Sequence, residues 1–234
     1  MMPINAWQDI VNELSGTIIV SCQAADDSPL NSPAMIAALA QSAARGQAGG
    51  LRINGPTNIV AVREVTGLPI IGINKIHREG YEVFITPLFQ DAMVVIEAGA
   101  DLVALDATNR PRPGGGNVAE LVTRIHDECA VPVMADIATA VEGRAALEAG
   151  ADLVATTLAG NTAYSPRREE PAFDIVEELA TEGRVVVEGG VWTVGDVRRC
   201  FDVGAFAVVI GSAITVPEFI TRRFVAAAGA RAAI

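Results

Sequence analysis

Short β-branched runs alternate with alanine-rich amphipathic stretches along nearly the whole chain of 234 residues. This alternation is typical of a parallel sheet whose strands are connected by crossover helices. The runs expected to form strands are Thr17–Cys22, Gly49–Ile53, Pro69–Asn74, Leu102–Asp106, Val131–Asp136, Leu153–Thr157, Val185–Glu188 and Ala207–Gly211. The helices expected between them include Ala34–Arg45, Asn58–Thr66, Asp91–Ala98, Val118–Cys129, Ala140–Ala149, Ala172–Glu182 and Thr193–Val203.

An internal repeat narrows the fold class further. The octapeptide that begins at Glu97 recurs letter for letter from Glu148, and a weaker copy begins at Asp202. The spacings of 51 and 54 residues each accommodate two strand–helix units, and each copy is typical of a helix C-cap glycine, a short loop and a buried strand. Because alternate strands of an eightfold barrel fill alternate core layers, we predict one α/β domain over residues 1–234, a (β/α)8 TIM barrel. A doubly wound open sheet is the alternative, but no Gly-x-Gly-x-x-Gly turn follows the first strand.

Charge and composition exclude several classes of function. The net charge of −11 leaves no basic stripe for nucleic acid, so nucleic acid is not an expected partner. No run of about 20 apolar residues is free of charges and turns, so no membrane span is expected. Residues 1–12 lack the pattern of a signal peptide. Three cysteines without metal-site spacing indicate reduced thiols in a cytoplasmic protein and predict no metal site.

The chain contains a single lysine, Lys75, beside sixteen arginines. Lys75 follows an apolar run that is typical of a buried strand reaching its exit loop. Arginine serves as well as lysine on a solvated surface, but a guanidinium keeps its proton in a protein, whereas a buried ammonium can lose one. We therefore interpret Lys75 as a candidate proton-transfer or Schiff-base residue. The alternative is an ordinary surface lysine in an arginine-rich chain.

Polar or glycine residues follow nearly every expected strand. In a barrel these positions meet at one rim, where the active sites of this fold lie. A residue that leaves a strand is often polar only because it meets solvent, but convergent carboxylate, amine, guanidinium and amide groups favour a catalytic or ligand site. The positions are Gln23, Arg52, Lys75, Asp106, Asp136, Thr156, Thr157, Glu188, Gly211 and Ser212.

Lys75 follows the third expected strand and Glu188 ends the seventh, so the two residues are expected to face each other across the rim. An amine and a carboxylate on either side of a substrate can move a proton at a carbon next to a carbonyl, once burial tunes both groups. Arg52 and Asp136 are expected to orient sugar hydroxyls or an acyl oxygen. The alternatives are an ion pair for Lys75 and a strand-end cap for Asp136.

Glycines follow the last two expected strands at Gly189, Gly190 and Gly211, the last beside Ser212. Barrel loops seven and eight commonly bind phosphate through backbone N–H groups, and glycine lets the main chain approach an anion closely. The same glycines would also suit tight turns that bind nothing. We expect a phosphate site at these two loops.

Several of these segments together resemble a known family. The most specific are Ser21–Gln23 and Asp106–Thr108 with Arg110–Pro113. The others, from first strand to last, are Pro69–Ile73 with Lys75, Val83–Pro87, Met134–Thr139, Thr156–Gly160, Glu188–Gly189 and Val209–Thr215. With them the chain resembles the N-acetylmannosamine-6-phosphate 2-epimerase family of sialic-acid catabolism.

The resemblance implies a (β/α)8 barrel that interconverts N-acetylmannosamine 6-phosphate and N-acetylglucosamine 6-phosphate by inverting C2, without nucleotide, metal or other cofactor. It implies that Lys75 is the main proton-transfer base and Glu188 its acid–base partner. The substrate-binding residues it implies are Gln23, Arg52 and Asp136 for the sugar, and Gly189, Gly190, Gly211 and Ser212 at the phosphate side. The expected partner is the small amino-sugar phosphate, and pairing with a second copy of the chain in a homodimer is left open.

Two departures from the family pattern leave the substrate open. The family commonly has a basic residue where this chain has Gly190, and an arginine where it has Val216. One lost charge-assisted contact costs about 1.5–3 kcal/mol unless it is replaced. Backbone donors or another arginine would then hold the phosphate, or the substrate would be a related or unphosphorylated amino sugar. Two further alternatives are a Schiff-base aldolase that uses Lys75 and a non-catalytic barrel that binds sugar phosphates.

Overall fold

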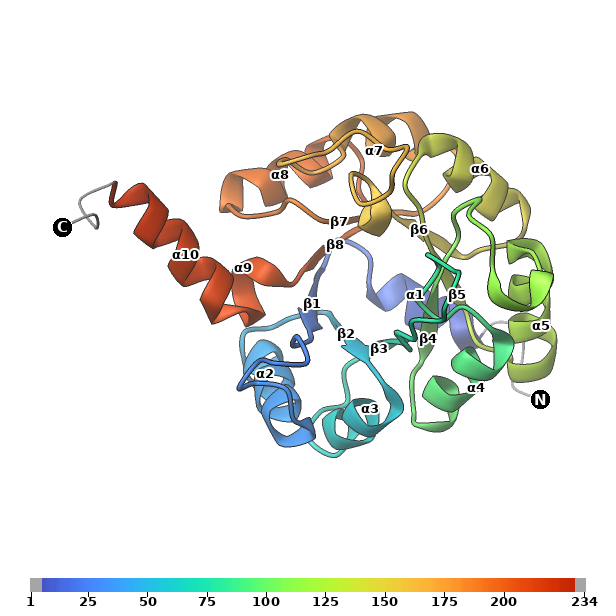
Figure 1. Ribbon diagram of the computed structural model, residues 1–234, viewed down its shortest axis with the longest axis horizontal. Coiled ribbons are helices and arrows are strands. Elements are labelled where there is room, and N and C mark those ends of the chain that lie inside the picture. The colour runs from blue at the N-terminus through green and yellow to red at the C-terminus, as the bar shows by residue number, and fades with distance from the viewer. Residues whose placement is uncertain (1–5, 230–234) are drawn as a thin grey trace.

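The structure, a computed structural model that describes residues 6–229, contains a closed barrel of eight parallel strands (Figure 1). Each strand pairs with its neighbours along the chain, and β8 pairs with β1 to close the ring. The predicted (β/α)8 TIM barrel is therefore confirmed; residues 1–5 and 230–234 of the predicted domain lie outside the described part. The strands are β1 (Ile18–Cys22), β2 (Gly50–Asn54), β3 (Ile70–Ile73), β4 (Leu102–Asp106), β5 (Val133–Asp136), β6 (Leu153–Ala155), β7 (Val185–Glu188) and β8 (Ala207–Ile210).

Seven helices surround the strands, and each buries at least one side chain. Three of them begin at a capping box, in which the N-cap side chain of Asn117, Thr139 or Thr193 and a carboxylate three residues later satisfy each other's backbone amides. Along residues 6–229 no helix has the length and apolar character needed to cross a membrane. The helices are α2 (Pro33–Arg45), α3 (Pro56–Arg63), α4 (Phe89–Glu97), α5 (Val118–Cys129), α6 (Ala140–Glu148), α7 (Phe173–Leu179) and α8 (Val194–Asp202).

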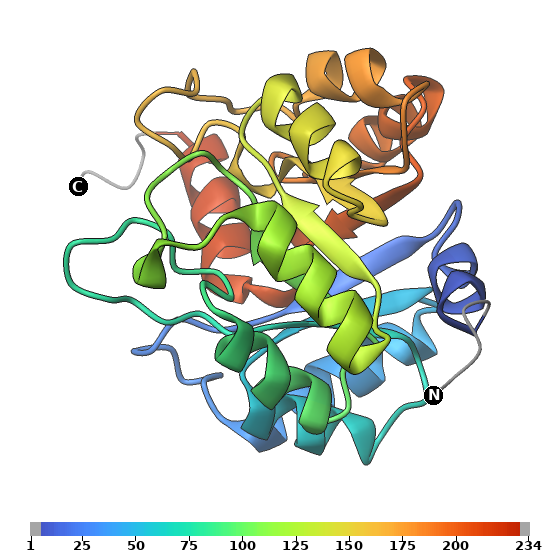
Figure 2. The same ribbon diagram turned by 90° about the vertical axis from the view of Figure 1, so that its right-hand side faces the viewer.

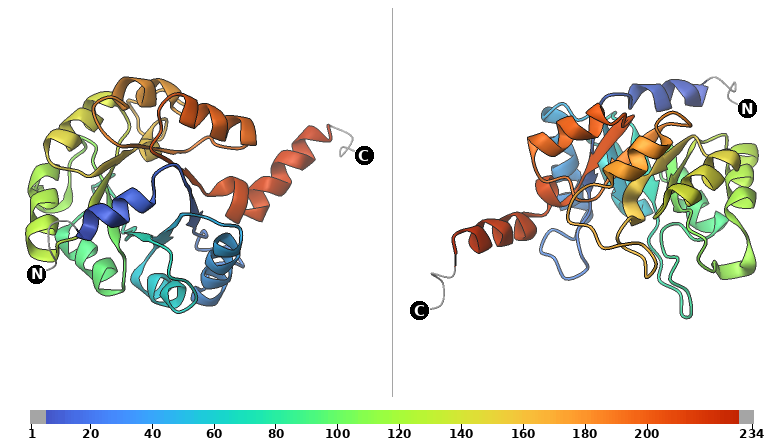
Figure 3. Two further views of the ribbon diagram at one scale, coloured as in Figure 1. Left: turned by 180° about the vertical axis from the view of Figure 1, so that it is seen from behind. Right: turned by 90° about the horizontal axis from the view of Figure 1, so that it is seen from above.

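The core has two layers, because alternate residues of each strand point into the barrel or outward to the helices. The inner cluster continues into α1 (Ala6–Glu13), whose Val11 is fully buried, and into the following Leu14. Figure 3 shows α1 lying across one end of the barrel. Figure 2 shows the teal loop after β3 and the orange loop after β6 extending from the opposite side. One end of the barrel is thus closed, and the carboxyl ends of the strands carry the long loops.

The internal repeat has the local structure predicted for it. Gly99, Gly150 and Gly204 all have positive φ, at 104°, 93° and 97°, which explains glycine after each preceding helix. The aspartates of the two identical copies, Asp101 and Asp152, each accept a hydrogen bond of 2.9 Å from the first residues of a neighbouring strand. The repeated aspartates therefore connect the loops that follow α4 and α6 to the first residues of β3 and β5 by hydrogen bonds.

Some predicted strand bounds are wrong by one or two residues. β6 ends at Ala155 rather than Thr157, because Thr156–Leu158 turn into the 3-10 helix η2. Beyond the end of β6, the hydroxyl of Thr156 takes the place of the backbone hydrogen bonds to β7. It donates to the carbonyl oxygen of Glu188 and accepts from the amide of Glu188, each at 3.0 Å. β5 begins after Pro132, which has no amide hydrogen for a sheet hydrogen bond.

Two helices follow β8, the short α9 (Ser212–Thr215) and α10 (Pro217–Ala227). Figure 1 shows α10 leading away from the barrel. It buries none of its residues, and Phe219, Phe224 and Val225 on it are exposed. A second 3-10 turn, η1 (Pro113–Gly115), lies in the loop before α5.

Candidate active site

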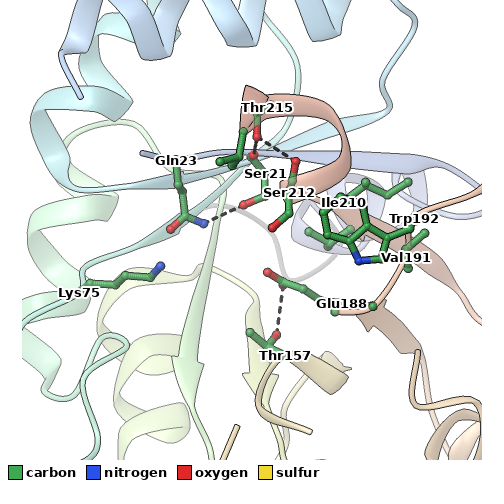
Figure 4. Close-up of a pocket in the computed structure, with 15 residues that line it drawn as sticks. Ser21, Gln23, Lys75, Thr157, Glu188, Val191, Trp192, Ile210, Ser212 and Thr215 are labelled. Carbon is green, nitrogen blue, oxygen red and sulfur yellow. Dashed lines mark hydrogen bonds between the residues drawn. The ribbon is translucent and has the colours of Figure 1, made fainter. Parts of the chain in front are cut away.

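A cavity of about 270 Å³ opens at the carboxyl ends of the strands (Figure 4). The loops after β7 and β8 form one wall, and residues from β1 and the β3 loop form the other. The lining residues are Ser21, Gln23, Lys75, Thr157, Glu188, Gly189, Gly190, Val191, Trp192, Val209, Ile210, Gly211, Ser212, Thr215 and Val216. Seven of the nine residues predicted for the site therefore meet in one cavity, while Arg52 and Asp136 lie outside its lining.

Arg52 and Asp136 form a buried ion pair beneath the cavity. Their side chains are 1% and 0% exposed, and two hydrogen bonds of 2.6 and 3.0 Å join the guanidinium to the carboxylate. Nη1 of Arg52 also donates to Oε2 of Glu188 at 2.6 Å. Because the two carboxylates surround the guanidinium, its pKa is raised despite burial, which alone would lower it. Arg52 is thus a fixed positive charge that holds Glu188 at the cavity floor.

Thr157 links the two carboxylates. Its hydroxyl lies 2.6 Å from Oδ1 of Asp136 and 3.1 Å from Oε2 of Glu188. A hydroxyl has one proton to donate, so only one of the two contacts is a hydrogen bond from threonine at any moment. The sequence placed Thr157 at a strand end without a role, and the structure shows it both lining the cavity and contacting Glu188.

Lys75 stands in a hairpin two residues beyond β3, where it forms an antiparallel bridge with Ile85. Its amide donates to Oδ1 of Asn54 at 2.9 Å, while its amine points into the cavity (Figure 4). In the described chain this amine forms no ion pair, so the ion-pair alternative has no support. Burial of the site lowers the pKa of Lys75, and the charge of Arg52 lowers it further. The side chain still meets water at the cavity opening, which limits that lowering.

Glu188 has its pKa shifted in the opposite direction. Its side chain is 17% exposed, and burial raises the pKa above the ordinary value of 4.5. The nearby charge of Asp136 acts in the same sense, whereas Arg52 opposes it. The environment therefore brings an amine and a carboxyl group toward a common pH range, as proton transfer between neighbouring groups requires.

The loops after β7 and β8 bring residues whose backbone amides have no hydrogen-bond partner in the described chain to the wall of the cavity. Gly189 and Gly190 both have positive φ, at 101° and 74°. Among residues 6–229 no carbonyl or side chain accepts a hydrogen bond from the amides of Gly189, Gly190 or Gly211. The amide of Ser212 is likewise without a partner there, and its hydroxyl lies at the cavity (Figure 4). These donors form a concave surface that suits an anion.

Gln23 reaches the cavity from the end of β1. Its Nε2 donates to the hydroxyl of Ser21 at 2.7 Å, and its Oε1 has no partner in the described chain. Asp106, expected at the same rim, instead binds its own loop: Oδ1 accepts from the hydroxyl of Thr108 at 2.6 Å, and Oδ2 pairs with Arg110 at 2.6 Å. Asp106 therefore shapes the β4 loop and does not line this cavity.

The cysteine thiols, which are the other candidate nucleophiles, do not line the cavity. Burial raises the pKa of the Cys22 thiol to about 12, which disfavours a thiolate nucleophile. Cys22, Cys129 and Cys200 are free cysteines. Among residues 6–229 no group of three or more histidine, cysteine or acidic side chains is arranged to hold a metal ion.

Known proteins resemble this chain over almost its whole length. A family model described as "Putative N-acetylmannosamine-6-phosphate epimerase" matches residues 36–230. A protein of Caldanaerobacter subterraneus subsp. tengcongensis, named "Putative N-acetylmannosamine-6-phosphate 2-epimerase", is 44% identical over 220 residues, with 93% of each chain covered. A protein of the same name from Synechococcus elongatus is 42% identical, over 96% of this chain and 98% of its own length.

Solved structures agree with these relatives. The N-acetylmannosamine-6-phosphate 2-epimerase from Clostridium perfringens superposes with a TM-score of 0.90 at 39% identity, covering 93% of this chain and 96% of that one. A thiamine phosphate pyrophosphorylase from Pyrococcus furiosus superposes with a TM-score of 0.57 at 14% identity, which shows the barrel fold alone. The chain therefore belongs to the N-acetylmannosamine-6-phosphate 2-epimerase family and is a carbohydrate isomerase.

Proposed function

We propose that the chain interconverts N-acetylmannosamine 6-phosphate and N-acetylglucosamine 6-phosphate by moving the proton at C2. The observation that carries this proposal is the meeting of Lys75 and Glu188 in one cavity, the amine with a lowered pKa and the carboxyl with a raised one. Both sugars have a carbonyl at C1 in their open-chain form, which makes the C2 proton acidic. The family relationship supports the same substrates.

The proposed reaction has two proton transfers. The neutral amine of Lys75 takes the C2 proton from one face, and the electron pair of that C–H bond forms the C1–C2 double bond of an enolate whose charge lies on the C1 oxygen. The carboxylic acid of Glu188 then returns a proton to C2 from the opposite face, so the centre is inverted. Lys75 ends as ammonium and Glu188 as carboxylate, and exchange with water at the cavity resets both groups. Such positioned acid–base groups contribute about 10²–10⁴-fold each.

Arg52, Asp136 and Thr157 support this step through Glu188. The guanidinium holds Oε2 of Glu188 at 2.6 Å, so the other carboxyl oxygen is left for the substrate. Direct contact of Arg52 or Asp136 with the sugar remains a prediction, and both are buried below the cavity floor. Gln23 has a free acceptor in Oε1 that would bind the amide N–H or a hydroxyl of the sugar.

The phosphate would lie against the amides of Gly189, Gly190, Gly211 and Ser212, together with the Ser212 hydroxyl. This arrangement keeps the phosphate at the β7–β8 side and brings C2 toward Lys75. Partly buried backbone donors are strong ligands for phosphate oxygens because they need no reorganisation.

The test is proton NMR in D₂O with N-acetylmannosamine 6-phosphate and, in parallel, unphosphorylated N-acetylmannosamine. We expect the gluco epimer with deuterium at C2 from the phosphate ester, and no exchange with Lys75→Ala although its melting temperature is unchanged. Turnover of the free sugar alone would redirect the proposal to an unphosphorylated substrate. Borohydride trapping of Lys75 with a sugar phosphate would favour the aldolase alternative, and binding without turnover would favour the non-catalytic barrel.

We also propose that the protein works as a homodimer in the cytoplasm. The exposed apolar side chains of Phe219, Phe224 and Val225 on the projecting α10 support a second copy as the partner. The three free cysteines support a reducing compartment. Light scattering should give twice the chain mass, and Phe224→Asp should yield the monomer; a monomeric wild-type chain would contradict the dimer.

A further inference from the structure

The loops after β7 and β8, at the expected phosphate side, carry no cationic side chain. The neighbouring β6 loop brings Arg168 to a separate pocket beside Gly189 and Gly190, where its guanidinium is paired with Asp174 at 2.6 Å. Gly190 cannot be replaced by a basic residue in this conformation, because a Cβ there would lie 2.5 Å from the carbonyl carbon of Glu170 and 2.7 Å from the nitrogen of Pro171. Val216 occupies the corresponding place after β8, and Lys75 is the only cationic side chain among the described lining residues. A doubly charged phosphate would therefore meet backbone amides but no guanidinium from these loops.

Trp192 lies at the same wall, between the β7 loop and α8. Its backbone amide donates to Oδ2 of Asp196 at 2.9 Å, so the capping box of α8 fixes the residue. Its indole N–H has no hydrogen-bond partner in the described chain, although the ring is half-buried and lines the cavity. Figure 4 shows the indole nitrogen on the side of the ring that faces Glu188 and the cavity. A donor is thus available at this wall.

Arg223 on α10 supplies a positive charge to that ring. The guanidinium carbon lies 4.2 Å from the centre of the Trp192 ring, which is a cation–π contact. α10 starts at Pro217, directly after the cavity residue Val216, and although the helix leads away from the barrel, Arg223 on it contacts Trp192 at the cavity wall. A cation stacked on an indole also polarises the N–H group and makes it a stronger donor.

We propose that Trp192 and Arg223 together select the phosphate ester. The indole N–H donates to a phosphoryl oxygen, and the stacked guanidinium supplies the positive charge that the two loops lack. This inference rests on the proposed function for the identity of the substrate. The inference gives α10 a role in substrate choice, although none of the residues of this helix is buried.

The experiment compares Trp192→Phe, Arg223→Gln and the matched control Arg222→Gln, whose guanidinium lies 5.3 Å from the Phe219 ring on the same helix. Calorimetry measures binding of N-acetylglucosamine 6-phosphate and of free N-acetylglucosamine, and the NMR assay gives kcat and KM. We expect both of the first two variants to weaken ester binding and raise its KM about tenfold. Trp192→Phe loses the charge-assisted hydrogen bond to the phosphate, and Arg223→Gln loses the positive charge stacked on that donor. In both variants the kcat and the binding of free sugar should be unchanged. The control Arg222→Gln should bind and turn over the ester as the wild type does.

Equal losses for ester and free sugar, unchanged ester binding, or an equal loss in Arg222→Gln would each overturn the inference. A wild-type chain that binds the ester without exchanging its C2 proton would contradict the proposed catalysis alone. The binding comparison would then still decide the roles of Trp192 and Arg223. A wild-type chain that binds the ester no better than the free sugar would overturn the proposed role of Trp192 and Arg223 in selecting the phosphate ester.

Discussion

Replacing Arg52 by methionine should destabilise the barrel and disable the site together. The guanidinium is 1% exposed and neutralises Asp136 and Glu188, so its removal leaves two close carboxyl groups without a cation. Breaking a buried ion pair by removing one partner costs about 3–5 kcal/mol in free energy of unfolding. For a chain of this size each kcal/mol lowers Tm by about 2–4 °C, so we expect a decrease of about 6–20 °C.

The loss should depend on pH with a definite sign. Burial already raises the pKa of Glu188 in the folded chain, and without Arg52 it would rise further. A carboxyl group with a higher pKa folded than unfolded favours folding below its unfolded pKa, and this contribution is lost as pH rises through the folded pKa. The difference in stability between wild type and Arg52→Met should therefore be smallest near pH 4.5, the ordinary value for glutamate, and increase toward neutral pH.

Urea unfolding at several pH values measures this difference, with Arg144→Met as the matched control. Arg144 forms exposed ion pairs with Glu178 and Glu182, so its replacement should cost less than about 1 kcal/mol. A loss in Arg52→Met no larger than in the control, or one that does not change with pH, would refute the assignment of Arg52 as the buried counter-ion.

Four further outcomes concern the chemistry. Lys75→Arg should reduce C2 proton exchange about 10²–10⁴-fold, because a guanidinium keeps its proton; NMR in D₂O that shows near-normal exchange would remove Lys75 as the base. Glu188→Gln should lower kcat by a similar factor with little change in KM, and unchanged turnover would reduce Glu188 to a structural part. Thr157→Val should lower kcat about tenfold and stability by about 1–3 kcal/mol, since it removes a hydrogen bond to a buried carboxylate that Arg52 alone then contacts; an unaltered kcat would mean that Thr157 does not position Glu188. kcat/KM should rise with pH as Lys75 loses its proton, with an apparent pKa below 10.5. A rise with an apparent pKa at or above that value would contradict the lowered pKa of Lys75.

The sequence predicted the barrel well because its signals are local. Each strand is a short apolar run, and the repeated glycines at 99, 150 and 204 mark helix ends that need a left-handed residue. The ends of the chain gave weaker signals. The closing helix α1 is only eight residues long and gives a short pattern around the buried Val11, and α10 buries no residue at all, so core packing imposes no pattern on it.

Much of the cavity lining could be predicted from the sequence as a set of residues, but not as a set of contacts. Strand ends pointed to Lys75 and Glu188, and both line the cavity. An arginine between Leu51 and Ile53 in a buried strand had to find an acidic partner, but the sequence did not show which carboxylates would reach it. That pairing depends on the twist and closure of the barrel, which bring β2, β5 and β7 to one point.

We therefore expect stability and the proposed catalysis to be coupled at Glu188 and separate at Lys75. Arg52, Asp136 and Glu188 belong to three strands that are not neighbours, so their ion pairs form only when the barrel closes. The same contacts fix the position of Glu188 and oppose the rise of its pKa. Lys75 has no ion pair in the described chain and is anchored only through its backbone. Changes to the Arg52 network should consequently lower stability and turnover in parallel, whereas changes to the Lys75 side chain should lower turnover alone.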